Sequence, residues 1–462
     1  MADTTATNSS VGSPGAFYPQ DFNIQKLTLL TDSGQTFDLK NLLMEFCYFE
    51  DIYSFSVSGY LTVRDAVGII ENFRMNGNEF IEVSFNKAKG ANDYNTQTYR
   101  VYKVGNRKPS GNMMSERFTL YFCSEEMLLS EQIRISKSYP GTEIYKIVND
   151  ILVNKLKVPT NRISIEQTKG VYDFIIPRTK PFETISWLST YARPASSAIG
   201  ADMLFFETKL GFNFKSLTSM LNGRVYNTYK YEQKNVSSPD RFDDFNNKVV
   251  NVLSYEFIKV YDRLNEISSG TYANKLISID PLTRNYKITN FDYAKFQSAL
   301  GGTNTNGILS PSANRLGFTQ NQAYDSVIKV AFGNADEKRD PYVAAAEAGA
   351  AHDIYIETYV PFRTAQISLA NYTVLKLTVP GDPNLIAGSV ITFNLYSLTG
   401  LNSSRQLDKF YSGNYLVTSV RHIIQSQGVY QTIVEIAKGS SPTSYGAGPN
   451  ETIATTTLTG AP

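Results

Sequence analysis

The fold is decided by TEIYKIVNDILVNKL (Thr142–Leu156), followed after a turn-rich link by YDFIIPRTKPFETISWLSTYA (Tyr172–Ala192). In the first segment apolar residues recur at the spacing of one helical face. These residues are Ile144, Ile147, Val148, Ile151, Leu152 and Leu156. Pro140-Gly141 breaks the chain just before them, and Thr142 is placed to cap the predicted helix. Burying such a face contributes roughly 10 kcal/mol before conformational entropy is counted, so the helix belongs to a core.

The second segment predicts a strand and then a helix. Tyr172, Phe174 and Ile176 alternate as the buried side of a strand should. Pro181 falls in the first turn of the following helix, where its missing N–H is not needed. Phe182, Ile185, Leu188 and Ala192 then lie on one helical side. Together the two segments predict a small packed α/β module.

Strand patterns dominate on both sides of this module. SGYLTVRDAVGIIENFRMNGNEFIEVSF (Ser58–Phe85) predicts a strand, a short helix capped by Asp65, a tight turn at Asn76-Gly77 and a second strand. LKLTVPGDPNLIAGSVITF (Leu375–Phe393) and SGNYLVTSVRHIIQSQGVYQTIVEIAK (Ser412–Lys438) are rich in Val, Ile, Thr and Tyr and contain turn signals.

These stretches resemble the central baseplate hub proteins of contractile-tailed phages, the late-control-D type, and the N-terminal part of VgrG-type secretion spikes. In those families a helix precedes a pattern Y-x-F-I-x-R-x-x-x-F-x-x-I-x-x-L. The matching positions here, with one more residue between the isoleucine and the arginine than in the pattern, are Tyr172, Phe174, Ile175, Arg178, Phe182, Ile185 and Leu188. The two flanking regions and SSGTYANKLISID (Ser268–Asp280) are similar in wording to the same families. The resemblance touches most of Leu27–Lys438 and leaves mainly Phe291–Val360 unmatched.

The resemblance implies an α+β, mainly β fold. It consists of two similar small antiparallel β-barrels of the tail-tube type, with an inserted α/β module and a further loop-rich insertion. The expected division is 1–19 flexible arm, 20–127 first barrel, 128–235 α/β module, 236–290 with 361–440 second barrel, 291–360 insertion and 441–462 flexible tail.

Three segments near the second barrel carry separate expectations. NVLSYEFIKVYDRLNEI (Asn251–Ile267) has helical periodicity, but the resemblance makes it two barrel strands, and we follow the resemblance. AAAEAGAAH (residues 344–352) is the best helix former of the insertion. VPFRTAQISLAN (Val360–Asn371) predicts a helix that returns the chain to the barrel.

Composition indicates a soluble protein made in a cytoplasm. In 462 residues, 44 Lys and Arg balance 43 Asp and Glu, which argues against a dedicated polyanion binder. There is no run of 18 apolar residues and no secretory signal pattern at the N-terminus. Cys47 and Cys123 lie in predicted strands of one barrel. A disulfide is conceivable if those strands pair, but two buried thiols fit the compartment better.

Residues for catalysis, cofactor binding or metal binding are not found. His352 and His422 have no Cys, His or Glu at ligand spacing, so a structural role is favoured for both. Gly301–Gly307 lacks the Lys-Ser/Thr of a phosphate-binding loop. Adjacent carboxylates at Glu125-Glu126 and Asp243-Asp244 point opposite ways in extended chain and do not flank one bond. We therefore expect a protein that is not an enzyme and has no cofactor.

Aromatic residues are abundant, with 30 Tyr and 27 Phe. Tyr60, Tyr102 and Tyr121 fall on the polar side of predicted strands. Half-exposed rings suit protein–protein contact, and they are equally typical of strands that favour aromatic residues. Both interpretations stay open for each residue.

The function that the resemblance implies is that of a structural hub in a phage tail baseplate, in the virion, assembled in the host cytoplasm. A homotrimer of duplicated barrels would form a pseudo-sixfold ring, with the tail tube above, the central spike below and wedge proteins around it. DNA would pass only as cargo. The alternatives are a receptor- or carbohydrate-binding baseplate module and a tail-associated cell-wall hydrolase. A VgrG-like spike is disfavoured because such chains continue into a needle region.

Overall fold

A computed structural model describes residues 22–31, 34–72, 75–86, 96–109, 115–196, 201–231, 251–281, 284–293, 295, 324–332, 360–396, 407–408, 410–426 and 428–439. The expectations for the N-terminal arm, the C-terminal tail, Asp243-Asp244, Gly301–Gly307 and the helix at 344–352 with His352 lie outside these ranges. None of the helices within them is long and apolar enough to cross a membrane.

The α/β module contains the predicted helix–strand–helix unit. The first helix is α3 (Ile144–Asp150), which continues as the π-helical turn η2 (Ile151–Lys155). β11 (Tyr172–Thr179) and α4 (Pro181–Tyr191) follow, with Pro181 at the helix start. All six apolar residues of the first segment are buried in one cluster with those of the second. The predicted helices, strand and core face are confirmed.

One detail of that prediction is wrong. Glu143 is the N-cap residue of α3, and its side chain makes no capping hydrogen bond. Thr142 instead ends β8 (Ile135–Thr142) and pairs with Tyr172 of β11. Its hydroxyl donates to the carbonyl of Pro140 at 2.8 Å. Strand pairing across the module therefore takes Thr142 out of the capping position.

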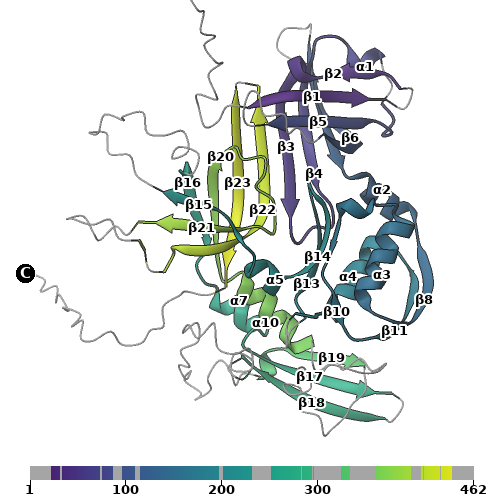
Figure 1. Ribbon diagram of the computed structural model, residues 1–462, viewed down its shortest axis with the longest axis vertical. Coiled ribbons are helices and arrows are strands. Elements are labelled where there is room, and N and C mark those ends of the chain that lie inside the picture. Colours follow the sequence, from purple (N-terminus) through teal and green to yellow (C-terminus); the bar gives the residue numbers. More distant parts are fainter. Residues whose placement is uncertain are drawn as a thin grey trace, which may run out of the picture.

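Short elements complete the module. They are α2 (Glu125–Gln132), η3 (Thr160–Arg162), β9 (Ile163–Ile165), β10 (Thr168–Lys169), β12 (Arg193–Pro194), β13 (Met203–Thr208), β14 (Gly211–Ser216) and α5 (Leu217–Leu221). β13, β14 and β9 form a three-stranded sheet. Figure 1 shows β13 and β14 between the large sheet and the helices α3 and α4.

An N-terminal unit of six strands precedes the module. Its strands are β1 (Asn23–Leu30), β3 (Leu43–Asp51), β4 (Ser58–Asp65), β5 (Phe80–Asn86), β6 (Gln97–Pro109) and β7 (Glu116–Cys123). β2 (Thr36–Asp38) is added at the edge beside β1, η1 (Lys40–Leu42) leads into β3, and α1 (Ile69–Asn72) follows β4. The predicted cap of α1 is confirmed, because Asp65 accepts hydrogen bonds from three backbone N–H groups. Gly77 has the positive φ expected of the turn.

A C-terminal unit of six strands is assembled from both sides of the insertion. Its strands are β15 (Val225–Tyr231), β16 (Ser254–Lys259), β20 (Thr373–Pro380), β21 (Val390–Leu395), β22 (Gly413–Gln425) and β23 (Val429–Lys438). β15 falls in the range expected for the α/β module, yet it pairs with β21 of this unit.

The two units share one sheet of 13 strands. The joint is an antiparallel ladder between β22 and β3, which runs from Ser419 opposite Asp51 to Gln425 opposite Glu45. Figure 1 shows β20, β23 and β22 beside β3 and β4. The mainly β class with antiparallel sheets is confirmed. The ladders stop short of closed barrels. Within the described strands none joins β1 to β3 or β15 to β16, and a single bridge connects Lys230 of β15 with Asn251, which precedes β16.

Both units have the same strand order. The six strands of each unit are numbered in the order in which they occur along the chain. Neighbouring strands in the sheet then follow the order second, third, sixth, fifth, fourth, first. This gives β3-β4-β7-β6-β5-β1 in one unit and β16-β20-β23-β22-β21-β15 in the other. The units differ in one direction, since β1 is antiparallel to β5 whereas β15 is parallel to β21. A shared order of six strands is the mark of a duplicated unit.

A smaller sheet is inserted in the chain between β16 and β20 of the C-terminal unit. α7 (Arg263–Ser268) leads to β17 (Ala273–Asp280), β18 (Asn285–Asp292), η5 (Tyr324–Ser326), β19 (Ile328–Phe332) and α10 (Val360–Ala370). The helix predicted from Val360 is confirmed. The expectation of two strands in Asn251–Ile267 is wrong in its second half, because Asp262 accepts a hydrogen bond from the N–H of Asn265 and starts α7.

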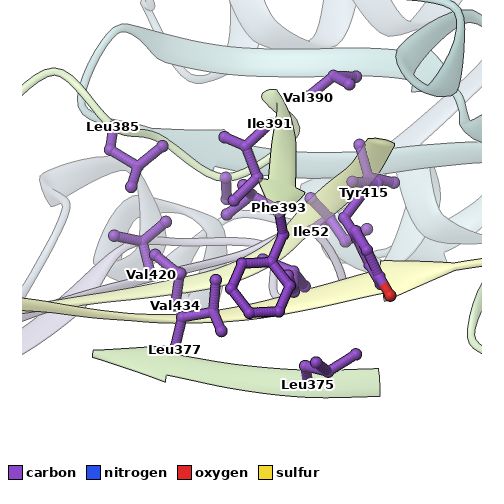
Figure 2. Packing of buried hydrophobic residues seen from close by; sticks show 14 of the residues in the cluster. Ile52, Leu375, Leu377, Leu385, Val390, Ile391, Phe393, Tyr415, Val420 and Val434 are labelled. Carbon is purple, nitrogen blue, oxygen red and sulfur yellow. The ribbon is translucent and has the colours of Figure 1, made fainter. Parts of the chain in front are cut away.

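Each unit has its own hydrophobic core. The core of the C-terminal unit gathers side chains from β20, β21, β22 and β23, including Leu377, Phe393 and Val434, as Figure 2 shows. The core of the N-terminal unit contains Phe46, Leu61 and Phe122, and β22–β23 contribute Ile424 and Tyr430 to it. The two halves are therefore joined by packing as well as by backbone ladders.

Candidate assembly surface

One face of the shared sheet points away from both cores, and we name it the outer face. Because strand side chains alternate, every second residue of β20, β23, β22, β3, β4 and β7 lies on it. In register across four of these strands stand Lys376, Glu435, Ser419 and Asp51. Glu256 of β16 extends the row and lies 3.5 Å from Lys376. This row holds three acidic residues and one lysine, which lies between Glu256 and Glu435.

The joint between the units carries a polar cluster on this face. The Tyr60 hydroxyl donates to Glu45 Oε1 at 2.5 Å, and Gln425 Nε2 donates to Glu45 Oε2 at 3.3 Å. Arg421 donates to the Tyr60 hydroxyl at 3.1 Å and to Cys47 Sγ at 3.5 Å. Since Arg421 and Gln425 belong to β22 and the others to β3 and β4, side chains connect the two units where the backbone ladder does.

The electrostatics of this cluster favour its charged groups. Burial by itself would raise the pKa of Glu45, but the hydrogen bonds from Tyr60, Gln425 and Cys47 outweigh it and hold that pKa below its usual value. Burial raises the pKa of the Cys47 thiol, so Cys47 stays protonated and unreactive at neutral pH.

An aromatic row continues from the cluster across the N-terminal unit. The ring of Tyr60 lies 6.1 Å from that of Phe49 and 6.3 Å from that of Tyr121, and Tyr121 lies 6.4 Å from Tyr102. The Lys103 ammonium lies over the Tyr121 ring at 5.1 Å. Tyr60, Tyr102 and Tyr121 are thus neighbours on one face, which the alternation predicted only as separate half-exposed positions.

On the core side of the sheet, two buried glutamate side chains connect the module to both units. Glu50 of β3 accepts hydrogen bonds from the backbone N–H groups of Lys209 in the module and Ala387 in the C-terminal unit, at 2.7 and 2.9 Å. Glu207 of β13 accepts from the N–H of Val57 and from Arg162, each at 3.1 Å. Sequence reasoning missed both residues, because each is a single acid in a strand and its partners are far away in the chain.

The residues singled out for chemistry have structural settings. His422 is buried, with Nδ1 at 3.0 Å from the Tyr430 hydroxyl and 3.2 Å from that of Thr432. Its burial lowers its pKa to about 3. Glu125 is exposed whereas Glu126 is buried and bound to Arg162, so the pair does not share one site. Within the described ranges no group of three or more His, Cys, Asp or Glu residues is arranged to hold a metal ion.

The two cysteines are buried free thiols, as expected. Cys47 lies in β3 and Cys123 in β7, and β4 runs between these strands. A disulfide would require direct pairing of the two strands.

Comparison with known proteins adds the sequence evidence. A search of described protein families finds no match. A probable baseplate hub protein of the Vibrio phage KVP40 is 23% identical over 396 residues, which cover 83% of this chain and 87% of that protein. This chain is therefore similar to a phage baseplate hub protein over most of both sequences. The resemblance to this family is thereby confirmed at the level of a curated relative.

The search of solved structures adds a comparison of the fold. A tail protein from Neisseria meningitidis MC58 superposes with a TM-score of 0.51 at 8% identity, covering 90% of this chain and 97% of that one. A 43 kDa tail protein of the prophage MuSo2 from Shewanella oneidensis has a TM-score of 0.48 at 9% identity, covering 90% and 98%. The first match shows that the arrangement of the units and the module is one found in a tail protein.

Proposed function

We propose that three copies of this chain form the hub of a phage tail baseplate. Each chain contributes two units of the same strand order, so three chains offer six similar units around an axis. Such a ring presents near-sixfold geometry to a tail tube on one side and threefold geometry to a central spike on the other. The observation that carries the proposal is the β22–β3 ladder, because it sets the two units edge to edge in one sheet.

In this arrangement the outer face lines the channel through which DNA passes. It is the one sheet surface common to both units. It carries charges of both signs, as Glu256, Lys376 and Glu435 show, and the whole chain has a formal net charge of only +1. A wall without a basic excess holds DNA weakly, since tight non-specific binding needs many phosphate contacts from Lys and Arg. That suits passage of DNA rather than retention.

The role is structural, within the baseplate of the virion tail. Tail tube, spike and surrounding baseplate proteins are the proposed partners. The buried side chains of Glu50 and Glu207 connect the module to the units. The outer-face cluster of Glu45, Tyr60 and Arg421 connects the units to each other. We propose the domain ranges expected from the sequence with two changes: β15 is counted in the C-terminal unit, and β17 and β18 are counted in the smaller sheet with β19.

The proposal is tested with the full chain alone and mixed with the tail tube protein of the same phage. Light scattering is expected to give three times the chain mass of 51.6 kDa, and electron microscopy a ring of six lobes at tube ends. Monomers at micromolar concentration that leave tube ends bare would overturn it. Cleavage of cell walls in a zymogram, or binding of the isolated chain to host cells, would favour the enzymatic or receptor-binding alternative.

A further inference from the structure

The duplicated units expose one strand edge that has a paired counterpart inside the chain. β22 and β6 occupy the fifth position of their units and are both 13 residues long. The first four residues of β22 pair with β21, and the first four residues of β6 pair with β5. In both, the register with the next strand shifts at the sixth residue, Thr418 in β22 and Tyr102 in β6. The two strands are equivalent residue by residue up to this point.

Beyond the shift their surroundings differ. The second half of β22, from Ser419 to Gln425, pairs with β23 on one side and with β3 on the other. The second half of β6, from Lys103 to Pro109, pairs with β7 on one side, and no described strand occupies its other side. Exposure follows pairing: Val420 of β22 is 1% exposed, and its counterpart Val104 is 39% exposed.

The strand that would complete the pattern is β16. It holds the second position in the C-terminal unit, as β3 does in the N-terminal unit, and each pairs with the third strand. β3 has β22 on its other edge, whereas no described strand pairs with the other edge of β16. Ile258 of β16 is 51% exposed. One chain therefore contains a second copy of each partner in the β22–β3 ladder: the second half of β6 corresponds to that of β22, and β16 corresponds to β3.

We propose that the second half of β6 in one copy pairs antiparallel with β16 of the next copy, repeating between chains the β22–β3 joint found within a chain. The occupant of this edge is a second copy of the chain. The proposal rests on the hub function above and specifies its subunit interface. A head-to-tail contact of this kind generates a closed ring when the rotation per step is right, and an open filament otherwise.

The internal joint also sets the register. Cys47 of β3 stands opposite Ile423 in β22. The ladders make Cys47 of β3 equivalent to Glu256 of β16. Cys47 stands opposite Tyr60 in β4, and Glu256 stands opposite Lys376 in β20, where β4 and β20 are the third strands of their units. Ile423 is the eleventh residue of β22.

The matching stretch of β6 is basic. Its eleventh residue is Arg107, which donates to Glu116 of β7 at 2.6 Å. A second register shift between Gly105 and Lys108 brings Lys108 to the outer face opposite Arg117. The repeat therefore places the Glu256 carboxylate of one copy beside the Arg107–Lys108 pair of the next. Opposite charges across a strand pair stabilise that register, and like charges oppose it.

The first test is disulfide trapping with the full chain. The double variant Lys108→Cys with Glu256→Cys is oxidised and run on a non-reducing gel. We expect covalent trimers that return to single chains on reduction, because each joint of the ring gains one bridge. Matched controls are the two single variants, which lack one half of each bridge, and Lys108→Cys with Tyr286→Cys, whose second thiol lies on the exposed face of β18. The buried Cys47 and Cys123 are common to all variants.

The second test reverses charges. Glu256→Lys alone, or Arg107→Glu with Lys108→Glu, is expected to weaken trimer association at least about tenfold, and the combination is expected to restore it. Circular dichroism of each variant controls for folding. Native-mass trimers that form no bridge and ignore the reversals would overturn the interface while leaving the hub function standing. Bridged trimers that do not bind the tail tube protein would support the interface and overturn the hub function.

Discussion

Glu207→Gln is expected to flatten the pH dependence of stability. Glu207 is 1% exposed and shares Arg162 with Glu126, whose Oε1 lies 3.0 Å from the guanidinium. Burial, together with the Glu126 carboxylate, raises the pKa of Glu207 to about 8. One guanidinium does not neutralise two carboxylates, and the more deeply buried one keeps its proton. At pH 7 the folded protein therefore holds a neutral Glu207 between Val57 and Arg162.

The sign of the pH dependence of stability follows from proton binding. The ordinary pKa of a glutamate in the unfolded chain is about 4.5. Because the folded state binds the proton more tightly, its contribution is full below pH 4.5 and is lost as the pH rises towards 8. At about 1.4 kcal/mol for each unit of pKa difference, the loss across this window is roughly 4 to 5 kcal/mol for Glu207 alone.

The assay is urea unfolding of wild type and Glu207→Gln at intervals from pH 5 to pH 8. The buried Glu50, whose pKa is also raised by burial, contributes a slope of the same sign to both proteins, so the difference between them isolates Glu207. We expect the free energy of unfolding of the wild type to fall by several kcal/mol more than that of the variant. Parallel pH profiles would refute the assignment of a neutral Glu207.

Two further substitutions test the packing of the N-terminal unit by the same unfolding assay. Gly59→Ala would bring a Cβ to 2.3 Å from the Phe122 ring and 2.4 Å from the Cys47 carbonyl oxygen, and we expect a loss of about 1 to 3 kcal/mol, against no measurable change for the exposed neighbour Ser58→Ala. Asp65→Ala removes the acceptor of three backbone N–H groups and is expected to cost about 1 to 2 kcal/mol, with Asp65→Asn intermediate. A cost for Ser58→Ala equal to that of Gly59→Ala, or a stable Asp65→Ala, would contradict these reasons.

Local patterns predicted local structure well. The apolar face of Thr142–Leu156, the alternation after Tyr172 and the proline at the start of α4 all depend on neighbours a few residues away, and the structure has them. Asp65 at its cap belongs to the same group. Two of the errors have different causes, one in a distant contact and one in a local cap. Thr142 was drawn into a strand by pairing, and Asp262 started a helix inside a stretch where family likeness favoured strands.

Contacts between distant segments could not be predicted from local sequence patterns. The ladder of β22 with β3 joins residues more than 300 positions apart, and the sequence of neither strand indicates which strand it pairs with. The cluster of Glu45, Tyr60 and Arg421 appears only after that ladder forms. The duplication is hidden in the same way: Tyr102 and Thr418 occupy equivalent register shifts and share no chemistry.

The duplication also determines where assembly is controlled. In the proposed ring, every second joint is the β22–β3 ladder, which is present as soon as one chain folds because both strands belong to it. The joints between chains use an equivalent edge but depend on protein concentration, since their strands meet only by association. Those joints are also the more polar, with Arg107 and Lys108 where β22 has Ile423 and its neighbours. A chain whose free edges are charged is protected from unspecific edge pairing while it is alone. In the proposed ring, this edge pairs with the strand of the next copy that carries the Glu256 carboxylate.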